Sequence, residues 1–222
     1  MKSILSFLRQ LARHNDREWF NTHKEEYLRV KRRADELAQR FINVVAEVDP
    51  EAANLSVADC TYRIYRDTRF SADKTPYKTH IGIFVNPPYG KKSERCGYYL
   101  HIEPENVFFC AGTVCLPSKV VTAIRRSIFD DIDEYRDIVE SEEFRRLLPN
   151  LGMNPVKTAP KGFDRYWEYI DYVRPRDFIA YSDPYPKEEV EKSDFIESLL
   201  PAVKEARRFN DFVNFSIENF FD

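Results

Sequence analysis

A cluster of cationic side chains between Arg63 and His80 is the stretch of the sequence most suited to chemistry. It reads RIYRDTRFSADKTPYKTH and has a formal net charge of +3, whereas the whole chain has a net charge of −3. Its cations are Arg63, Arg66, Arg69, Lys74 and Lys78. Arginine presents a planar fork of donors to a carboxylate or phosphate, and lysine presents a point charge. We therefore expect these five residues to bind a small anionic ligand.

Three titrating side chains in the same stretch could move protons on a bound ligand. They are Asp67, Tyr77 and His80, and Tyr65 adds a further hydroxyl. A positioned carboxyl, phenol or imidazole is a common general acid or base. Asp67, Tyr77 and His80 are therefore the candidate catalytic residues, although the sequence leaves open whether the chain is an enzyme.

The same residues also have a purely structural interpretation. Asp67 would pair with Arg63 or Arg69, Asp73 would pair with a lysine of the same stretch, and the tyrosines would pack. Exposed ion pairs of this kind are common and contribute little individually. Under this interpretation the cluster stabilises a hairpin and binds no ligand.

The sequence around the cluster predicts a run of strands. We expect strands at residues 61–70, 79–85, 96–103 and 106–113, with a loop at 71–77 and a polar turn at 86–95. Four successive strands without intervening helices favour a mainly antiparallel sheet. Alternation along the first strand would place Arg63, Asp67 and Arg69 on one face and Arg66 on the other.

Helical periodicity flanks these strands on both sides. We expect a short amphipathic helix ending near Asn15, then a helix of about 30 residues that starts at Asp16 and stops before Pro50. Further helices are expected at 118–129, 130–143, 164–173, 188–200 and 202–220, with a loop at 150–160 and a short strand at 178–181. The predicted fold is α+β, with a mainly antiparallel sheet packed by the long N-terminal helix and the C-terminal helices in one domain spanning 1–222.

The start of the long predicted helix, HNDREWF, has two interpretations. It is either a capped helix start with an aromatic anchor, or its polar residues line a cleft together with the basic cluster. The loop APKGF, residues 159–163, is similarly either an ordinary turn or an anion site.

Composition limits the possible partners. Thirty-four basic residues nearly balance 37 acidic ones, so overall charge gives no case for nucleic acid or a membrane surface. No apolar run approaches the roughly 18 residues of a membrane span, and Arg9 and Arg13 interrupt the N-terminal apolar stretch. We expect a cytoplasmic protein without a membrane partner.

The cysteines and histidines give little support for a metal or a nucleophile. Cys60, Cys96, Cys110 and Cys115 form no C-x-x-C pair, and we expect reduced thiols. Cys60 precedes the basic cluster and is either activated by it or buried and inert. The histidines lack a metal-ligand spacing, but His80 and His101 are expected on neighbouring strands, which leaves open a site assembled in space.

Several motifs resemble one protein family. RIYRDTRFSADKTPYKTH is similar to the hallmark stretch of the DUF2461 family, proteins of unknown function. FLRQLARHNDREWFNTHKEEY, GYYLHIEP and APKGF resemble other parts of that family, so the resemblance covers most of the chain. The chain departs from it at CAGTVCLP, where the family often has a Gly-Gly turn and this sequence has only Gly112. The resemblance implies a shared fold and a shared polar stretch, and it implies no activity.

Three functions follow from these observations. The first is an enzyme or binding protein for a small phosphate- or carboxylate-bearing ligand. The second is a non-enzymatic interaction protein in which the cluster is a structural ion-pair network. The third is a module for single-stranded nucleic acid, with tyrosines stacking on bases. Cofactor and oligomeric state do not follow from the sequence.

Overall fold

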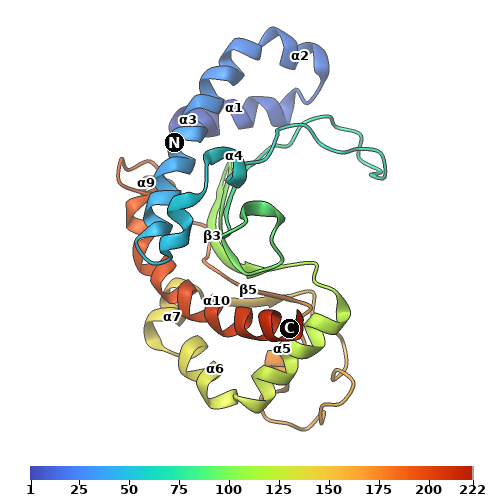
Figure 1. Ribbon diagram of the computed structural model, residues 1–222. Helices are drawn as coiled ribbons and strands as arrows, with labels where there is room; N and C mark the ends of the chain where they lie inside the picture. The colour runs from blue at the N-terminus through green and yellow to red at the C-terminus, as the bar shows by residue number, and fades with distance from the viewer. Residues whose placement is uncertain (222) are drawn as a thin grey trace. The chain divides into compact units, whose positions relative to one another are not determined.

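The computed structural model describes residues 1–221, apart from the side chains of Lys92, Phe220 and Phe221 (Figure 1). The chain forms two compact units. The first unit comprises Met1–Lys91, Tyr99–Phe108 and Pro184–Leu200, and the second comprises Lys92–Tyr98, Phe109–Asp183 and the chain from Pro201 onward. All residues of the basic cluster therefore lie in the first unit.

Five strands form one sheet with the order β1-β2-β3-β5-β4. The strands are β1 Ile81–Val85, β2 Gly97–Glu103, β3 Asn106–Thr113, β4 Asn150–Met153 and β5 Asp177–Tyr181. Strand β5 pairs antiparallel with both neighbours, with Cys110 opposite Tyr181 and Asn150 opposite Tyr181 on its other side. The predicted α+β fold with a mainly antiparallel sheet is confirmed.

Alternation along β2 gives the sheet two different faces. Leu100 and Ile102 are fully buried, whereas Tyr99, His101 and Glu103 are only partly buried. Successive side chains of a strand point to opposite faces, so these three polar residues share one face. That face of β2 takes part in the candidate site.

The helices of the first unit pack against one another (Figure 1). They are α1 Lys2–Arg13, α2 Arg17–Thr22, α3 Lys24–Ala46, α4 Val57–Cys60 and α9 Lys187–Val190, with the short 3-10 turns η1 Pro50–Asn54, η2 Gly90–Lys92 and η3 Glu197–Leu199. The N-terminal amphipathic helix is confirmed as α1, which packs along α3 and buries Ile4, Leu5, Phe7, Leu8 and Leu11. Each such side chain contributes about 1.5–3 kcal/mol on burial.

The long predicted helix is interrupted, because α2 ends at Thr22 and α3 begins at Lys24. His23 has φ −104° and ψ 15°, and its Nδ1 lies 2.8 Å from the carbonyl oxygen of Trp19. The hydroxyl of Thr22 donates to the same carbonyl at 2.8 Å. The backbone amide of His23 also donates to this carbonyl at 3.1 Å, so three groups converge on it at the break between α2 and α3.

The strand predicted at 61–70 is wrong. This segment is extended but makes only isolated bridges, Thr61 with Ile83 and Tyr65 with Tyr77. Farther along, side chains bond to nearby backbone instead: Asp67 accepts from the amide of Arg69, and Lys74 donates to the carbonyl of Thr68. Local bonds of this kind compete with a strand ladder. We call residues 61–80 the basic arm, which Figure 1 shows in teal reaching out beyond α4.

The helix predicted at 188–200 is also wrong, since only α9 and η3 form there. Arg40 of α3 donates to the carbonyl of Ser193 and forms an ion pair with Glu197. That carbonyl is one that a continuous helix would satisfy internally. The tertiary contact therefore replaces part of the predicted helix.

Helices of the second unit surround an aromatic core. They are α5 Ser118–Asp130, α6 Ile132–Val139, α7 Glu142–Leu147, α8 Ile170–Val173 and α10 Leu200–Phe221. Tyr135 lies 6.4 Å from Phe209 and 5.2 Å from Phe212 between ring centroids. The predicted helices at 118–129 and 202–220 are confirmed by α5 and α10.

Two expectations for the second unit are corrected. Residues 150–153, predicted as loop, form β4, where Gly152 adopts φ +71° and a register shift separates Leu151 from Met153. A short strand with such a glycine resembles a turn in sequence. The helix predicted at 164–173 is reduced to α8, because Asp164 accepts from the amide of Tyr166 and starts a turn instead.

Candidate functional site

The basic arm folds back on itself through two backbone hydrogen bonds. The amide of Arg66 donates to the carbonyl of Pro76 at 2.9 Å, and the amide of Lys78 donates to the carbonyl of Ile64 at 2.8 Å. These bonds flank the bridge between Tyr65 and Tyr77. The arm therefore has a paired base near these residues and a tip between Asp67 and Thr75.

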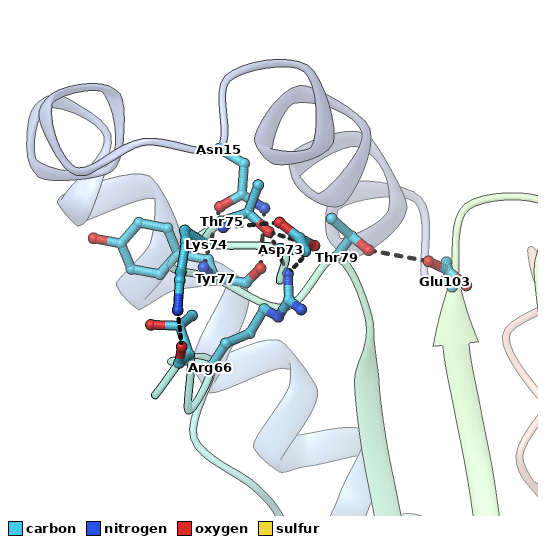
Figure 2. Close-up of polar contacts among 9 residues, drawn as sticks. Asn15, Arg66, Asp73, Lys74, Thr75, Tyr77, Thr79 and Glu103 are labelled. Atoms are coloured by element: carbon cyan, nitrogen blue, oxygen red, sulfur yellow. Dashed lines mark hydrogen bonds and ion pairs between the residues drawn. The ribbon is translucent and has the colours of Figure 1, made fainter. Parts of the chain in front are cut away.

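Asn15 fastens the base of the arm to the N-terminal helices (Figure 2). Its Nδ2 donates to the carbonyl of Tyr77 at 2.9 Å, and its Oδ1 accepts from the amide of Tyr77 at 3.1 Å. Tyr77 is 4% exposed, and its ring stacks on Phe20 with 4.0 Å between the ring centroids. Burial raises the pKa of Tyr77. This arrangement makes Tyr77 an anchor of the arm, and it explains the part of HNDREWF that contacts the basic cluster.

Arg66 stabilises the tip from within. Its guanidinium donates to Asp73 and to the hydroxyl of Thr75, as Figure 2 shows. Asp73 also accepts from the Thr75 amide at 2.9 Å. The bond from that amide, together with the bonds from Arg66 and the Thr75 hydroxyl, lowers the pKa of Asp73 to about 2.

The remaining residues of the tip are paired in the same way. Asp67 accepts from Arg69 through both oxygens, with Oδ2 at 2.7 Å from Nη2, and this bond lowers the pKa of Asp67. Lys74 donates to the carbonyl of Thr68 at 2.9 Å. Four of the predicted residues, Arg66, Asp67, Arg69 and Lys74, thus bond within the arm. The structural interpretation of the sequence anticipated the Asp67–Arg69 pair, but Asp73 pairs with Arg66 and not with a lysine.

A cavity of about 830 Å³ lies beside the base of the arm in the first unit. Three predicted site residues line it, Arg63, Lys78 and His80. The other five predicted residues do not line it: Arg66, Asp67, Arg69, Lys74 and Tyr77. Its apolar lining comes from α1, α3, α4, the arm and β1: Phe7, Leu8, Val30, Ala34, Val57, Ala58, Ile64, Ile81 and Gly82. Tyrosines 27, 62, 65 and 99 add phenol groups to the wall.

Two of the three cations that line the cavity, Arg63 and Lys78, have no carboxylate partner among the described residues. Arg63 is exposed, and the ammonium of Lys78 lies 5.2 Å from the ring centroid of Tyr62. Asp35 also lines the cavity, but it pairs with Lys31 at 2.5 Å. Burial, and secondarily the charge of Arg63, lowers the pKa of Lys78. The site therefore has an excess of positive charge that an anion would relieve.

His80 connects the cavity to the partly buried face of β2. Its ring stacks on His101 at 4.7 Å, and burial together with His101 lowers the pKa of His80. His101 lies between Tyr99 and Glu103: its Nδ1 is 3.0 Å from the Tyr99 hydroxyl, and its Nε2 is 3.3 Å from Glu103 Oε2. The hydroxyl of Thr79 donates to the other oxygen of Glu103 at 3.1 Å (Figure 2).

The expected proximity of His80 and His101 is thus confirmed, but a metal site is not found. Among the described residues, no group of three or more His, Cys, Asp or Glu side chains is placed to hold a metal ion. Asp67 instead bonds to Arg69 at the tip of the arm. Burial raises the pKa of the Cys60 thiol to about 11, which agrees with the inert alternative for that residue.

Sequence reasoning anticipated His101 near His80 but missed the other two polar residues of this face of β2, Tyr99 and Glu103. Tyr99, His101 and Glu103 occupy alternate positions of GYYLHIEP, and this spacing places them on one face of a strand. That alternation was the signal available in the sequence. Their link to the basic cluster depends on the pairing of β1 with β2, which brings His80 beside His101.

Comparisons with known proteins agree with the resemblance of the motifs. Neither the curated proteins nor the solved structures that were searched contain a match. Separately, no described helix is long and apolar enough to cross a membrane. The family model described as "Conserved hypothetical protein (DUF2461)" matches residues 3–212 of the 222-residue chain. The chain therefore belongs to the DUF2461 family.

Proposed function

We propose that the chain binds a small anionic ligand with an apolar or aromatic portion in the cavity beside the base of the basic arm. One observation carries this proposal. Arg63 and Lys78, which have no carboxylate partners among the described residues, line the same cavity as many apolar side chains and several tyrosines. A pocket with mostly apolar lining and a few convergent polar groups is typical of small-molecule sites. Aryl carboxylates and aryl phosphates combine the two required features.

The proposal narrows the predicted ligand-binding set. Arg63 and Lys78 would contact the anion, and His80 would be the titrating group nearest to it among the residues predicted from sequence. Arg66, Arg69 and Lys74 would instead hold the shape of the arm, because each donates to an oxygen of the arm itself. To contact a ligand, each of these cations would have to give up a bond within the arm.

A thermal-shift screen tests the proposal. The panel contains benzoate, phenyl phosphate, inorganic phosphate, dicarboxylates, nucleotides and short single-stranded oligonucleotides, each at low and moderate salt. A ligand at 100 times its Kd adds about 2.7 kcal/mol to stability. Each kcal/mol raises Tm by about 2–4 °C in a protein of this size. We expect an aryl anion to give a salt-tolerant rise.

Matched variants locate the site. The rise should be lost in Arg63→Gln and in Lys78→Gln but kept in Arg69→Gln, which removes an equal charge from the tip. A rise that Arg69→Gln abolishes as fully as Arg63→Gln would contradict a site in the cavity. If only oligonucleotides shift Tm, and the shift disappears steeply with salt, the nucleic-acid alternative replaces this proposal.

A further inference from the structure

We propose that Tyr99, His101 and Glu103 form a proton relay, in which the Tyr99 oxygen is the acid–base group at the wall of the cavity. The inference rests on the proposed function, because it adds a reaction to the ligand site. It assigns Tyr99 as the residue that touches the ligand, and His101 and Glu103 as positioning residues. The relay assigns the acid–base role to a phenol other than Tyr77, which anchors the arm.

The hydrogen bonds fix the direction of the relay. Burial by itself would raise the pKa of Glu103, but bonds from His101, Thr79 and Asn106 together lower it, so Glu103 is a carboxylate near neutral pH. A carboxylate only accepts, so His101 Nε2 carries the proton of that bond. Nδ1 of the neutral ring is then an acceptor, and the Tyr99 hydroxyl donates to it across 3.0 Å.

The surroundings hold the His101 ring in this orientation. Its side chain is 12% exposed and lies between two aromatic rings, with centroid distances of 4.7 Å to His80 and 4.8 Å to Phe108. Thr79 holds the second oxygen of Glu103. The charged and titrating groups around this ring are thus Glu103, Tyr99 and His80, with Lys78 acting on His80. A carboxylate that orients an imidazole and stabilises its cation is a recurring device in acid–base sites.

The position of Tyr99 in the wall depends on a missing side chain on the neighbouring strand. A Cβ atom at Gly82 would lie 2.7 Å from the Tyr99 hydroxyl oxygen and 2.8 Å from its Cε2. Gly82 and Tyr99 both line the cavity that also contains Arg63 and Lys78. The glycine therefore allows the phenol to lie at the wall while it bonds to His101.

The proposed step is a proton transfer that balances without a further reactant. An O–H or C–H bond of the anionic ligand breaks, its proton bonds to the Tyr99 oxygen, and the phenol proton passes to His101 Nδ1. The products are the conjugate base of the ligand and an imidazolium paired with Glu103. Arg63 and Lys78 stabilise the added negative charge, and the reverse sequence protonates a ligand. The substrate class is an anion with an acidic proton.

Labelling by a neutral arylsulfonyl fluoride tests the relay without any anion. The Tyr99 oxygen bonds to sulfur, the S–F bond breaks, fluoride leaves, and the phenol proton passes to His101. Mass spectrometry measures the labelling rate of each tyrosine. General-base assistance contributes about 10²–10⁴-fold, so we expect the Tyr99 rate to fall at least about tenfold in His101→Gln and Glu103→Gln. Tyr62, which lines the same cavity, should keep its rate, as should Tyr99 in the Asp67→Asn control.

A Tyr99 rate that is unchanged in both relay variants would overturn the inference. The tautomer of His101, read from ¹⁵N chemical shifts of the unaltered protein, is a second test that does not depend on how a variant folds. The relay requires the proton on Nε2, and a neutral ring protonated on Nδ1 would contradict it. The thermal-shift screen reports on the ligand site, whereas labelling by a neutral probe and the tautomer of His101 report on the relay, so failure of the ligand site and failure of the relay are distinguishable.

Discussion

Individual side chains divide the basic cluster into two roles. Near the tip, Arg66 and Arg69 bond to carboxylates of the arm, and these contacts are local. At the base, Arg63 and Lys78 line the cavity without a carboxylate partner among the residues that the structure describes. Residues of one type in one stretch of sequence therefore have different neighbours, and only the neighbours decide which cation is available to a ligand.

The Asp73 carboxyl provides a pH test of the hydrogen bonds at the tip of the arm. Its pKa of about 2 in the folded chain lies below the ordinary value of 3.8. A lowered carboxyl pKa gives stability that is present above the ordinary value and is lost as pH falls through the folded value. We expect an NMR titration of Asp73 to give a pKa near 2, and to rise part of the way toward 3.8 in Arg66→Gln combined with Thr75→Ala, because the bond from the Thr75 amide remains. An unperturbed pKa in the unaltered protein would contradict the described tip.

The two bonds from Asn15 to Tyr77 provide a stability test. Asn15→Ala leaves a partly buried amide and carbonyl of Tyr77 without their partner, which should cost about 1–3 kcal/mol in the free energy of unfolding. Chemical denaturation measures this loss, and hydrogen exchange of the Tyr77 amide should become faster. Asn15→Asp is the matched control, because it keeps the acceptor for the amide but lacks the donor. Equal stability of Asn15→Ala and the parent chain would show that the arm is held by other contacts.

Regular elements were predictable where apolar periodicity decides the structure. The strands β2 and β3 and the helices α5 and α10 lie within a few residues of their predicted bounds. The basic arm was not predictable in this way, since its alternation resembles a strand while side-chain bonds to nearby backbone replace the ladder. For the same reason the predicted separation of Arg66 from Arg63 by strand faces does not describe the arm.

The candidate site was predictable only in part. Arg63, Lys78 and His80 were found from residue type, because cations and an imidazole stand out in sequence. The contribution of Tyr99, His101 and Glu103 depends on the alignment of β1 with β2 and on the space above Gly82. Strand pairing is a tertiary property, so a single stretch of sequence does not contain it.

The close approach of Gly82 on β1 to Tyr99 on β2 gives a testable prediction. In Gly82→Ala the new Cβ would meet Tyr99 at less than 3.0 Å, so the ring must move and its bond to His101 should break. Overpacking of this kind costs about 1–3 kcal/mol. Denaturation should show this loss in Gly82→Ala and a partial recovery when Tyr99→Ala is added. If the losses in the free energy of unfolding from Gly82→Ala and from Tyr99→Ala simply add, the two residues do not approach each other as described.

The arrangement of the whole molecule places the arm, the cavity and the relay within one unit. All the residues that line the cavity belong to the first unit, as do Tyr99, His101 and Glu103. The second unit has its own aromatic core around Tyr135 and Phe209. The proposed chemistry therefore uses the geometry of the first unit alone.

Calorimetric titration of the anion that performs best in the screen tests the central claim most directly. The comparison is between the parent chain, Arg63→Gln combined with Lys78→Gln, and Arg69→Gln combined with Lys74→Gln. A hydrogen bond to a charged group contributes about 1.5–3 kcal/mol, so losing two should weaken binding by at least about 100-fold. We predict that loss for the cavity pair and nearly parental affinity for the tip pair. Equal weakening in both double variants, or none in the cavity pair, would contradict a ligand site at the base of the arm.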